Sequence, residues 1–305
     1  MSAQHVALIG LGEVGQVLAD DLRRVPGVRL SAWDRLLPVA GSEPQRAARA
    51  RSFLSAAGSM AEALRGSTTV ISAVTAGECR SAAAEAARAL PAGAFYLDLN
   101  SVSPGTRSEA AEAIAAGGGR YVEAAVMAPI APQRVAAPIW LGGPHAREFL
   151  PLAQAFGFAG ARVYADEIGP ASAAKMCRSI IVKGLEALLA ESLLTARRHG
   201  VEDVVLASLH DLLPARDWRE LARYMIARSV QHGARRAEEM REAARTVSEA
   251  GFEPWMSRGG VERQQWAAQY SAALAAQALT GMLDRILAQQ ASAPAAPSAL
   301  QAARR

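Results

Sequence analysis

One lysine stands in the middle of an alanine-rich stretch, "GPASAAKMCRSI" at residues 169–180, which otherwise has the composition of a buried helix. Lysine is rarely buried unless it is paired or takes part in chemistry, so Lys175 needs an explanation. An amine held by a rigid helix could exchange a proton with a bound molecule, as a general acid or base does. A lysine whose aliphatic stem lies along an interdomain surface is the alternative.

The neighbours of Lys175 on the same helical face are also polar. Spacings of three and four residues place Ser172, Arg178 and Ser179 beside it. Arg178 could hold a carboxylate as a charge-assisted pair, and Ser179 could orient the lysine or a substrate. This face of the helix therefore predicts a site for a small anionic molecule.

A second group of chemically informative residues is a glycine turn near the start of the chain, Gly10-Leu11-Gly12-Glu13-Val14-Gly15. A β-rich run precedes it and an amphipathic helical run follows, as dinucleotide binding requires. Gly10 allows the tight turn, Gly12 lets the backbone approach a pyrophosphate, and Gly15 permits close packing of helix on strand. The free N–H groups of the helix attract the phosphates. The alternative is a glycine-rich turn that binds nothing.

Asp34 ends the second β-rich run, about 20 residues after the last glycine, where such sites carry an acid. An acid there accepts hydrogen bonds from ribose hydroxyls and repels a 2′-phosphate, which favours NAD over NADP. Arg35 follows directly and could instead stack on adenine or hold a 2′-phosphate, so NADP stays open. An ordinary loop position is the alternative for Asp34.

The elements that must position these residues alternate in the first half of the chain. Short β-rich runs lie at 5–10, 28–33, 68–74, 94–99, 120–126 and 138–143. Helical runs lie at 13–25 and 78–89, and another opens at Pro104. This alternation predicts crossover units and a parallel sheet, and so an α/β, doubly wound Rossmann domain over 1–165.

The pattern changes near residue 165, after which no convincing strand follows. Residues 169–200 predict one long helix, shorter helical runs continue to about 250, and a last helix covers 258–290. We expect an all-α domain over 166–290. The Ala/Pro-rich segment 291–305 predicts a disordered tail.

Ligands of such a sheet bind at the carboxyl ends of its strands. This rule makes Val74 and Thr75, after one strand, candidates for cofactor binding. Asn100 and Ser101 follow the next strand, and Asn100 joins the cofactor candidates. An N-cap role explains Ser103 fully, but it does not explain the polar pair before it.

Composition restricts the class of protein. The 305 residues are 51% hydrophobic and 20% charged, enough for one large or two ordinary domains. The net charge of +4 is mild and the arginines are interleaved with glutamates, so no nucleic-acid stripe is indicated. Two distant cysteines and no apolar run of about 18 residues lead us to expect a cytoplasmic protein that does not enter a membrane. The five dispersed histidines predict no metal site.

Together these motifs resemble the β-hydroxyacid dehydrogenase family, which includes 3-hydroxyisobutyrate dehydrogenase and is similar to 6-phosphogluconate dehydrogenase in its N-terminal half. The matching segments are "GLGEVG" at 10–15, "DLNSVSP" at 98–104, "VEAAVMAP" at 122–129 and "GPASAAKMCRS" at 169–179. The resemblance implies a Rossmann domain followed by an all-α domain that forms a homodimer. It also implies an NAD(P)-dependent dehydrogenase that moves a hydride between nicotinamide and a hydroxy acid, with Lys175 as general acid/base.

The same resemblance assigns the substrate residues. Ser101 would contact the substrate, and Met127 and Ala128 would belong to the substrate loop. The family's loop usually reads Asp-x-Pro-Val-Ser-Gly-Gly, but Glu123 replaces its aspartate here. Residues 127–129, Met-Ala-Pro, replace Ser-Gly-Gly, so a substrate carboxylate must be anchored differently.

Two further departures lie beside the lysine. Ser179 stands where the family usually has asparagine, and Ala171 stands where it has a glycine. We expect the chemistry to be retained and the substrate to differ from the common small hydroxy acids. The sequence names neither the substrate nor the direction of the reaction.

Two alternatives of other kinds stay open. Imine reductases share the architecture but usually carry Asp or Tyr in place of the lysine, which argues against them. A non-catalytic dinucleotide-binding redox sensor is the other alternative. The segment "QHGARRAEEMRE" at 231–242 predicts a solvated charged face, although Arg235 or Arg236 could reach the cleft and complete the site.

Overall fold

The computed structural model describes residues 4–212 and 217–292, and the chain forms two compact units. The first unit takes in Met1–Ser179 and Glu242–Pro254, and the second takes in Ile180–Arg241 and Trp255–Arg305. The boundaries fall inside helices, because α8 (Pro170–His199) and α10 (Trp218–Glu249) each contribute to both units. The first unit thus extends beyond the domain expected over 1–165. From residue 293 the expected tail lies outside the described residues.

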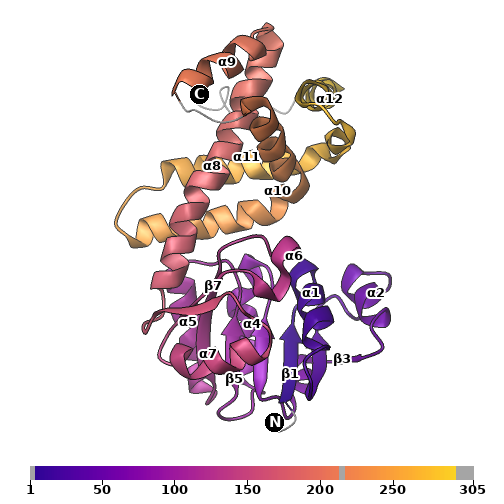
Figure 1. Ribbon diagram of the computed structural model, residues 1–305, viewed down its shortest axis with the longest axis vertical. Helices are drawn as coiled ribbons and strands as arrows, with labels where there is room; N and C mark the ends of the chain where they lie inside the picture. Colours follow the sequence, from indigo (N-terminus) through magenta and orange to yellow (C-terminus); the bar gives the residue numbers. More distant parts are fainter. Residues whose placement is uncertain (1–3, 213–216, 293–305) are drawn as a thin grey trace, which may run out of the picture. The chain divides into compact units, whose positions relative to one another are not determined.

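One sheet of eight strands forms the centre of the first unit (Figure 1), in the order β3-β2-β1-β4-β5-β6-β7-β8. The strands are β1 (Gln4–Ile9), β2 (Val28–Trp33), β3 (Leu54–Ala56), β4 (Thr69–Ser72), β5 (Phe95–Asp98), β6 (Arg120–Val126), β7 (Ile139–Gly142) and β8 (Ala161–Ala165). All neighbouring strands are parallel except β6 and β7. The order reverses between β1 and β4, which confirms the doubly wound fold.

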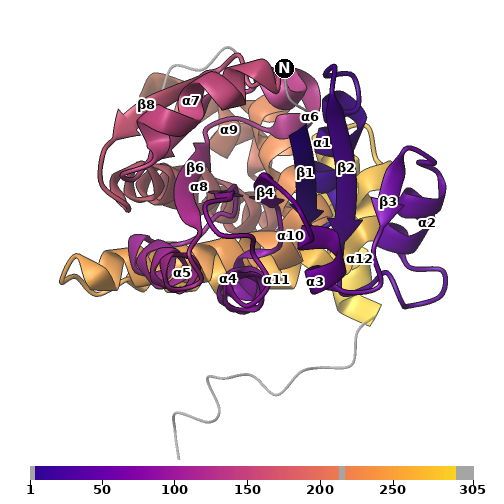
Figure 2. The same ribbon diagram turned by 90° about the horizontal axis from the view of Figure 1, so that it is seen from below.

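Helices cover both faces of this sheet (Figure 2). Side chains of α1 (Glu13–Leu22), α2 (Glu43–Arg49) and α7 (Ala146–Ala155) pack into the core on one face. Those of α3 (Met60–Leu64), α4 (Cys79–Ala87) and α5 (Pro104–Ala116) pack into the other. β1 shows why: Leu8 enters the first core while Ala7 and Ile9 enter the second, because successive side chains of a strand alternate in direction.

The second unit is helical within its described residues. It contains parts of α8 and α10 together with α9 (Glu202–Leu212), α11 (Trp255–Ala267), η3 (Ala268–Ala275) and α12 (Leu279–Ser292). Residues 218–249 form one helix where several shorter runs were expected. Gly233 lies inside this helix, and a side chain there would meet the backbone of Gln264 on α11. The helix expected over 258–290 is interrupted at Tyr270, which has non-helical dihedral angles.

Two strands were not predicted. β3 has three residues and β8 five, and neither shows a run of buried β-branched side chains. β8 pairs with β7 through an irregular register, so the sheet extends beyond the six strands that the sequence indicates. Short strands of this kind depend on their neighbours in the sheet more than on their own composition.

Candidate functional site

The residues expected to hold a cofactor and a substrate emerge from one edge of the sheet. The pairing register aligns one residue of each of five strands in a row: Trp33, Ile9, Ser72, Asp98 and Glu123. Because these strands are parallel, the chain leaves all of them at the same edge. The segments that follow contain Gly10–Gly15, Asp34, Val74, Thr75, Asn100, Ser101, Met127 and Ala128.

The glycine turn joins β1 to α1 as the sequence predicts. Gly10 has a φ of 92°, in the left-handed region that favours glycine, and a side chain there would meet the Ala73 carbonyl. A side chain on Gly15 would meet the Gly10 carbonyl, whereas one on Gly12 would meet nothing within 4 Å. No side chain caps the N-terminus of α1, so its first N–H groups can serve an anion.

The other residues of the turn differ in exposure. Leu11 is buried in the core of the sheet, Val14 is half-buried, and Glu13 is exposed. The part of this segment that is open to a ligand is therefore mainly its backbone. This agrees with the glycine positions, because only a bare backbone allows phosphates to come close.

Asp34 supports the glycine turn directly. Its Oδ2 accepts a hydrogen bond from the Leu11 N–H at 2.8 Å, and its Oδ1 accepts one from the Leu36 N–H at 2.9 Å. A carboxylate has further lone pairs that ribose hydroxyls could use. Arg35 forms an ion pair with Glu78 at 2.7 Å, so it would have to leave Glu78 before holding a 2′-phosphate.

Asn100 joins the ends of β4 and β5. Its Oδ1 accepts from the Val74 N–H at 2.8 Å, its Nδ2 donates to Ser72 Oγ at 3.0 Å, and the residue is 2% exposed. Asn100 therefore links the ends of the two strands by hydrogen bonds, and its side chain is not exposed at the edge. Ser101 is half-buried, and within the described residues its hydroxyl has no hydrogen-bond partner, while Thr75 is exposed. The Ser101 hydroxyl thus lies at this edge without an intramolecular hydrogen bond in the described ranges.

A fully buried ion pair, which sequence reasoning missed, lies behind the same edge. Asp98 on β5 and Arg107 on α5 are both 0% exposed, with 2.9 Å between Oδ1 and Nη1. Arg107 also donates to the Asn100 and Ala124 carbonyls, so it ties the end of β5 to β6. Burial alone would lower the pKa of Arg107, but Asp98 raises it above its ordinary value. The sequence did contain a signal for this ion pair: Asp98 is a carboxylate in an otherwise apolar strand, and a buried carboxylate requires a partner.

Cys79 and Tyr121 complete this buried network. The Tyr121 hydroxyl donates to Asp98 Oδ2 at 2.8 Å, and the Cys79 thiol lies 3.4 Å from the same oxygen. Burial, and then the charge of Asp98, raises the pKa of Cys79 above its ordinary value. The thiol therefore stays protonated, and its role is packing rather than nucleophilic attack.

Glu123 anchors the helix that carries Lys175. It is 0% exposed, and its two carboxylate oxygens accept from the Gly169 N–H at 2.7 Å and the Ser172 N–H at 2.6 Å. These N–H groups belong to the start of α8, which otherwise leaves them without partners. Gly142, opposite Glu123 on β7, makes room for the carboxylate. The sequence placed Glu123 in the substrate loop and missed this contact.

Lys175 lies in the second turn of α8 and is half-buried. On the same face Ser172 and Ser179 are buried, and the Ser172 hydroxyl donates to the Gly169 carbonyl at 3.0 Å. Arg178 is exposed and has no ion pair with any other described residue. On the polar face that the sequence predicts, the two serines are therefore buried, and Lys175 lies between them and the exposed Arg178 in its degree of burial.

The loop that the sequence predicts to bind substrate follows β6. Met127 and Ala128 are half-buried, and the Met127 N–H donates to the Pro138 carbonyl at 2.9 Å. Pro129, which is exposed, leads into the short helix α6 (Ile130–Gln133). The Met127 N–H is thus already used, and Pro129 has none to give.

Carboxylates fill the N-terminus of α5. Ser103 caps this helix as predicted, accepting from the Thr106 N–H at 3.2 Å. Glu242 accepts from the Ser103 N–H at 2.9 Å, and Glu249 accepts from the Gly105 N–H at 3.1 Å. Both acids belong to the part of α10 that lies in the first unit. A substrate anion would find these N–H groups already bonded.

The segment 231–242 is not the solvated face that we expected. Arg236 and Glu239 are 7% and 8% exposed, and they form ion pairs with Glu186 and Lys183. Arg235 is exposed and pairs with Glu239 at 2.7 Å. The expectation overlooked that Glu186 and Lys183 of α8 face this part of α10, which makes burial of the charges possible.

Two further features are absent from residues 4–212 and 217–292. No group of three or more His, Cys, Asp and Glu side chains comes together there in a way that could hold a metal ion. Within the same ranges, no helix is long and apolar enough to cross a membrane.

Comparison with known proteins matches both parts of the chain. Residues 5–165 match the model for the NAD binding domain of 6-phosphogluconate dehydrogenase, and residues 196–267 match a domain of unknown function, DUF1932. A conserved hypothetical protein from Sinorhizobium meliloti is 34% identical, with 94% of this chain and 97% of that chain covered and a TM-score of 0.69. No protein of curated function matches.

Two further solved structures are similar. The conserved protein MTH1747, described as of unknown function and structurally similar to 3-hydroxyacid dehydrogenases, is 32% identical over 87% of this chain and 97% of that chain (TM-score 0.65). A 3-hydroxyisobutyrate dehydrogenase of Mycobacterium tuberculosis is 17% identical over 93% of this chain and 99% of that chain (TM-score 0.66). Imine reductases share the fold at similarly low identity, so the fold alone does not separate these activities.

Proposed function

The chain belongs to the β-hydroxyacid dehydrogenase family, and from that premise we propose that it is an oxidoreductase that moves a hydride between a nicotinamide cofactor and a hydroxy acid. The observation that carries the proposal is a pair of helix starts in the first unit. α1 begins uncapped behind a glycine turn, and α8, whose first turn is held by a buried carboxylate, carries Lys175 in its second turn.

The residues at the glycine turn fit a dinucleotide. The open space beside Gly12 and the uncapped start of α1 suit phosphates, and the Asp34 carboxylate suits ribose hydroxyls. We propose NAD as the preferred form. Asp34 and the Arg35–Glu78 ion pair support this preference, because together they disfavour a 2′-phosphate.

A bound nicotinamide supplies hydride transfer to or from carbon. We propose that the Lys175 amine takes the hydroxyl proton when an alcohol is oxidised and returns it in the reverse reaction. Ser101 donates to the substrate, and Ser179 orients the lysine or the substrate. Glu123 fixes the first turn of α8 and so the backbone from which Lys175 extends.

The choice of lysine supports a proton-transfer role. Only two of the 33 basic Lys and Arg residues are lysines, Lys175 and Lys183. Arginine cannot release its proton in the working pH range, whereas an amine can. Lys183 is accounted for by its ion pair with Glu239 at 2.6 Å.

The substrate is proposed to differ from the common small hydroxy acids. The Met127 N–H is bonded to Pro138, and Ala128 and Pro129 replace two glycines, so the loop offers little backbone to a carboxylate. Exposed Arg178 is a candidate anchor. We further propose a homodimer formed through the helical unit, to be tested by light scattering, and a cytoplasmic location.

The deciding experiment mixes the purified full chain with NAD or NADP and a panel of 3-hydroxy acids. Activity appears as growth of the absorbance band of the reduced nicotinamide, and the Lys175→Met variant should bind cofactor equally but not turn over. A redox sensor would bind cofactor with no absorbance change on any acid. An imine reductase would oxidise reduced cofactor with cyclic imines and ignore the hydroxy acids, and either result would contradict the proposal.

A further inference from the structure

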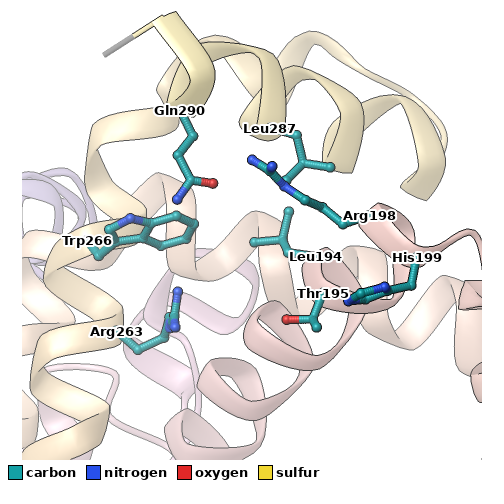
Figure 3. Close-up of a pocket in the computed structure, with 8 residues that line it drawn as sticks. All are labelled: Leu194, Thr195, Arg198, His199, Arg263, Trp266, Leu287 and Gln290. Atoms are coloured by element: carbon teal, nitrogen blue, oxygen red, sulfur yellow. The ribbon is translucent and has the colours of Figure 1, made fainter. Parts of the chain in front are cut away.

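A pocket of about 290 Å³ lies in the helical unit, between α8, α11 and α12 (Figure 3). All its lining residues lie between 194 and 290, so it is separate from the glycine-turn edge. Its volume is close to the lower end of ligand pockets, which run from about 300 Å³ upward. A small organic molecule would fit, whereas a dinucleotide would not.

Basic and amide side chains from three helices line this pocket. Arg198 and His199 come from the end of α8, Arg263 comes from α11, and Gln290 comes from α12. Basic residues at a helix C-terminus are ordinary by themselves, because they complement the helix dipole. The helix dipole does not account for Arg263, which lies outside the last turn of α11, or for the neutral Gln290. No carboxylate is among the residues that line the pocket.

Arg197 and Arg198 are adjacent in the chain, but only one of them has carboxylate partners among the described residues. Arg197 is neutralised by Asp284 at 2.8 Å and Glu202 at 3.2 Å. The Arg198 side chain enters the pocket, and its guanidinium has no ion pair or hydrogen bond within the described ranges. Its charge is therefore available for an external anion.

The rest of the lining is apolar and includes one flat surface. Leu194 and Leu287 line the pocket together with the half-buried indole of Trp266. The guanidinium of Arg263 lies over one face of the Trp266 ring, 4.7 Å from its centre, and both side chains line the pocket. This pairing suits a ligand with a charged end and a planar body.

We propose that this pocket binds a small organic anion, a carboxylate or phosphate ester, whose anionic group meets Arg198 and Arg263 and whose planar body lies against Trp266. The proposal does not rest on the function proposed for the first unit. A ligand bridging three helices would also stabilise the folded chain, because it binds only that state.

The test is calorimetric titration of the full chain, with NAD saturating in both solutions so that the glycine turn is occupied. The probes are phenyl phosphate, benzoate, inorganic phosphate and benzyl alcohol. We expect one site per chain for phenyl phosphate or benzoate, with inorganic phosphate and neutral benzyl alcohol at least about tenfold weaker. Whichever of the two anions binds more tightly identifies the anionic group.

Variants then locate the site. Arg198→Gln and Arg263→Gln should each weaken binding about tenfold and remove the thermal stabilisation. Arg285→Gln removes an exposed charge on α12 outside the pocket and should change nothing. Binding that is equal in all variants would overturn the proposal, as would the absence of saturable binding by any probe. So would a change of oligomeric state in Arg198→Gln without probe binding, since that result would make this face an interface between two copies.

Discussion

Two helices of the first unit, α1 and α8, start in opposite ways. α1 follows a glycine turn, has no side-chain cap, and leaves its first N–H groups for a ligand. α8 follows Gly169, and the buried Glu123 carboxylate takes two of its N–H groups at 2.6–2.7 Å. The partial positive charge of a helix start is present in both cases. It binds a ligand only where the chain supplies no carboxylate of its own.

The difference assigns distinct tasks to the two helices. A free start is suited to holding phosphates, whereas an occupied start is suited to fixing what the helix carries. α8 carries Lys175 five residues after its first residue, Pro170. The following experiments, from the largest expected effect to the smallest, are designed to break or sharpen this contrast.

The largest effect is expected for Lys175→Met. Loss of the proton carrier should lower kcat about 10²- to 10⁴-fold, the usual contribution of a general acid or base. Cofactor affinity, measured by fluorescence titration, should stay within a factor of two of the original. The control is Cys177→Ala, an exposed position two residues further on α8, which should keep full activity. Full turnover in Lys175→Met would contradict the proposal that α8 positions a proton-transferring lysine.

Gly12→Ala tests the open start of α1. A methyl group there meets no protein atom within 4 Å, so the melting temperature should hardly change. It would occupy the approach of the phosphates, and cofactor affinity should fall about 10- to 100-fold, as for loss of a charged hydrogen bond. Gly15→Ala should lose both affinity and stability, because its methyl group meets the Gly10 carbonyl. Unchanged affinity in Gly12→Ala would show that α1 holds no phosphate.

Glu123→Gln tests the occupied start of α8. The amide removes the charge and turns a donor toward one of two N–H groups, so the free energy of unfolding should fall by about 1–3 kcal/mol. If Glu123 positions the lysine, kcat should fall at unchanged cofactor affinity and its pH profile should shift. The control is Glu148→Gln, an exposed acid in the first turn of α7, with an expected loss below about 0.5 kcal/mol. Equal losses in both variants would contradict the anchoring role.

Glu78→Gln tests cofactor choice beside α1. Releasing Arg35 from its exposed ion pair should raise affinity for NADP by up to about fivefold, the range that such pairs contribute. Affinity for NAD, measured in the same titration, should not change. An equal rise in affinity for both cofactors would mean that Arg35 does not contact the 2′-phosphate.

The smallest effect concerns the two thiols. Exposed Cys177 should react with a thiol reagent in the native protein at mildly alkaline pH. Cys79 should not react until the chain is unfolded, because burial and Asp98 raise its pKa, so the neutral thiol persists as pH increases. Stoichiometric labelling with and without denaturant measures this. Rapid native reaction of both thiols would mean that the network behind the sheet edge is open.

Much of the first unit could be predicted from the sequence because its signals are local. The run at 28–33 is β2, the turn at 10–15 joins β1 to α1, and Ser103 caps the helix that opens at Pro104. The helix at 169–200 also matches α8 within one residue at each end. Alternating hydrophobicity, glycine position and capping each act over a few residues, so the chain alone specifies them.

What only the tertiary structure decided depends on pairs that are distant in the chain. Nothing near Glu123 indicates that it meets Gly169 and Ser172, or that Arg107 is buried against the Asp98 carboxylate. Nothing near Arg236 indicates its pairing with Glu186 on α8. A buried charge is stable only where a partner and hydrogen bonds meet it, and those come from other elements. Composition and spacing thus determined which residues could do chemistry, and the packing of strands and helices decided which of them stay available for it.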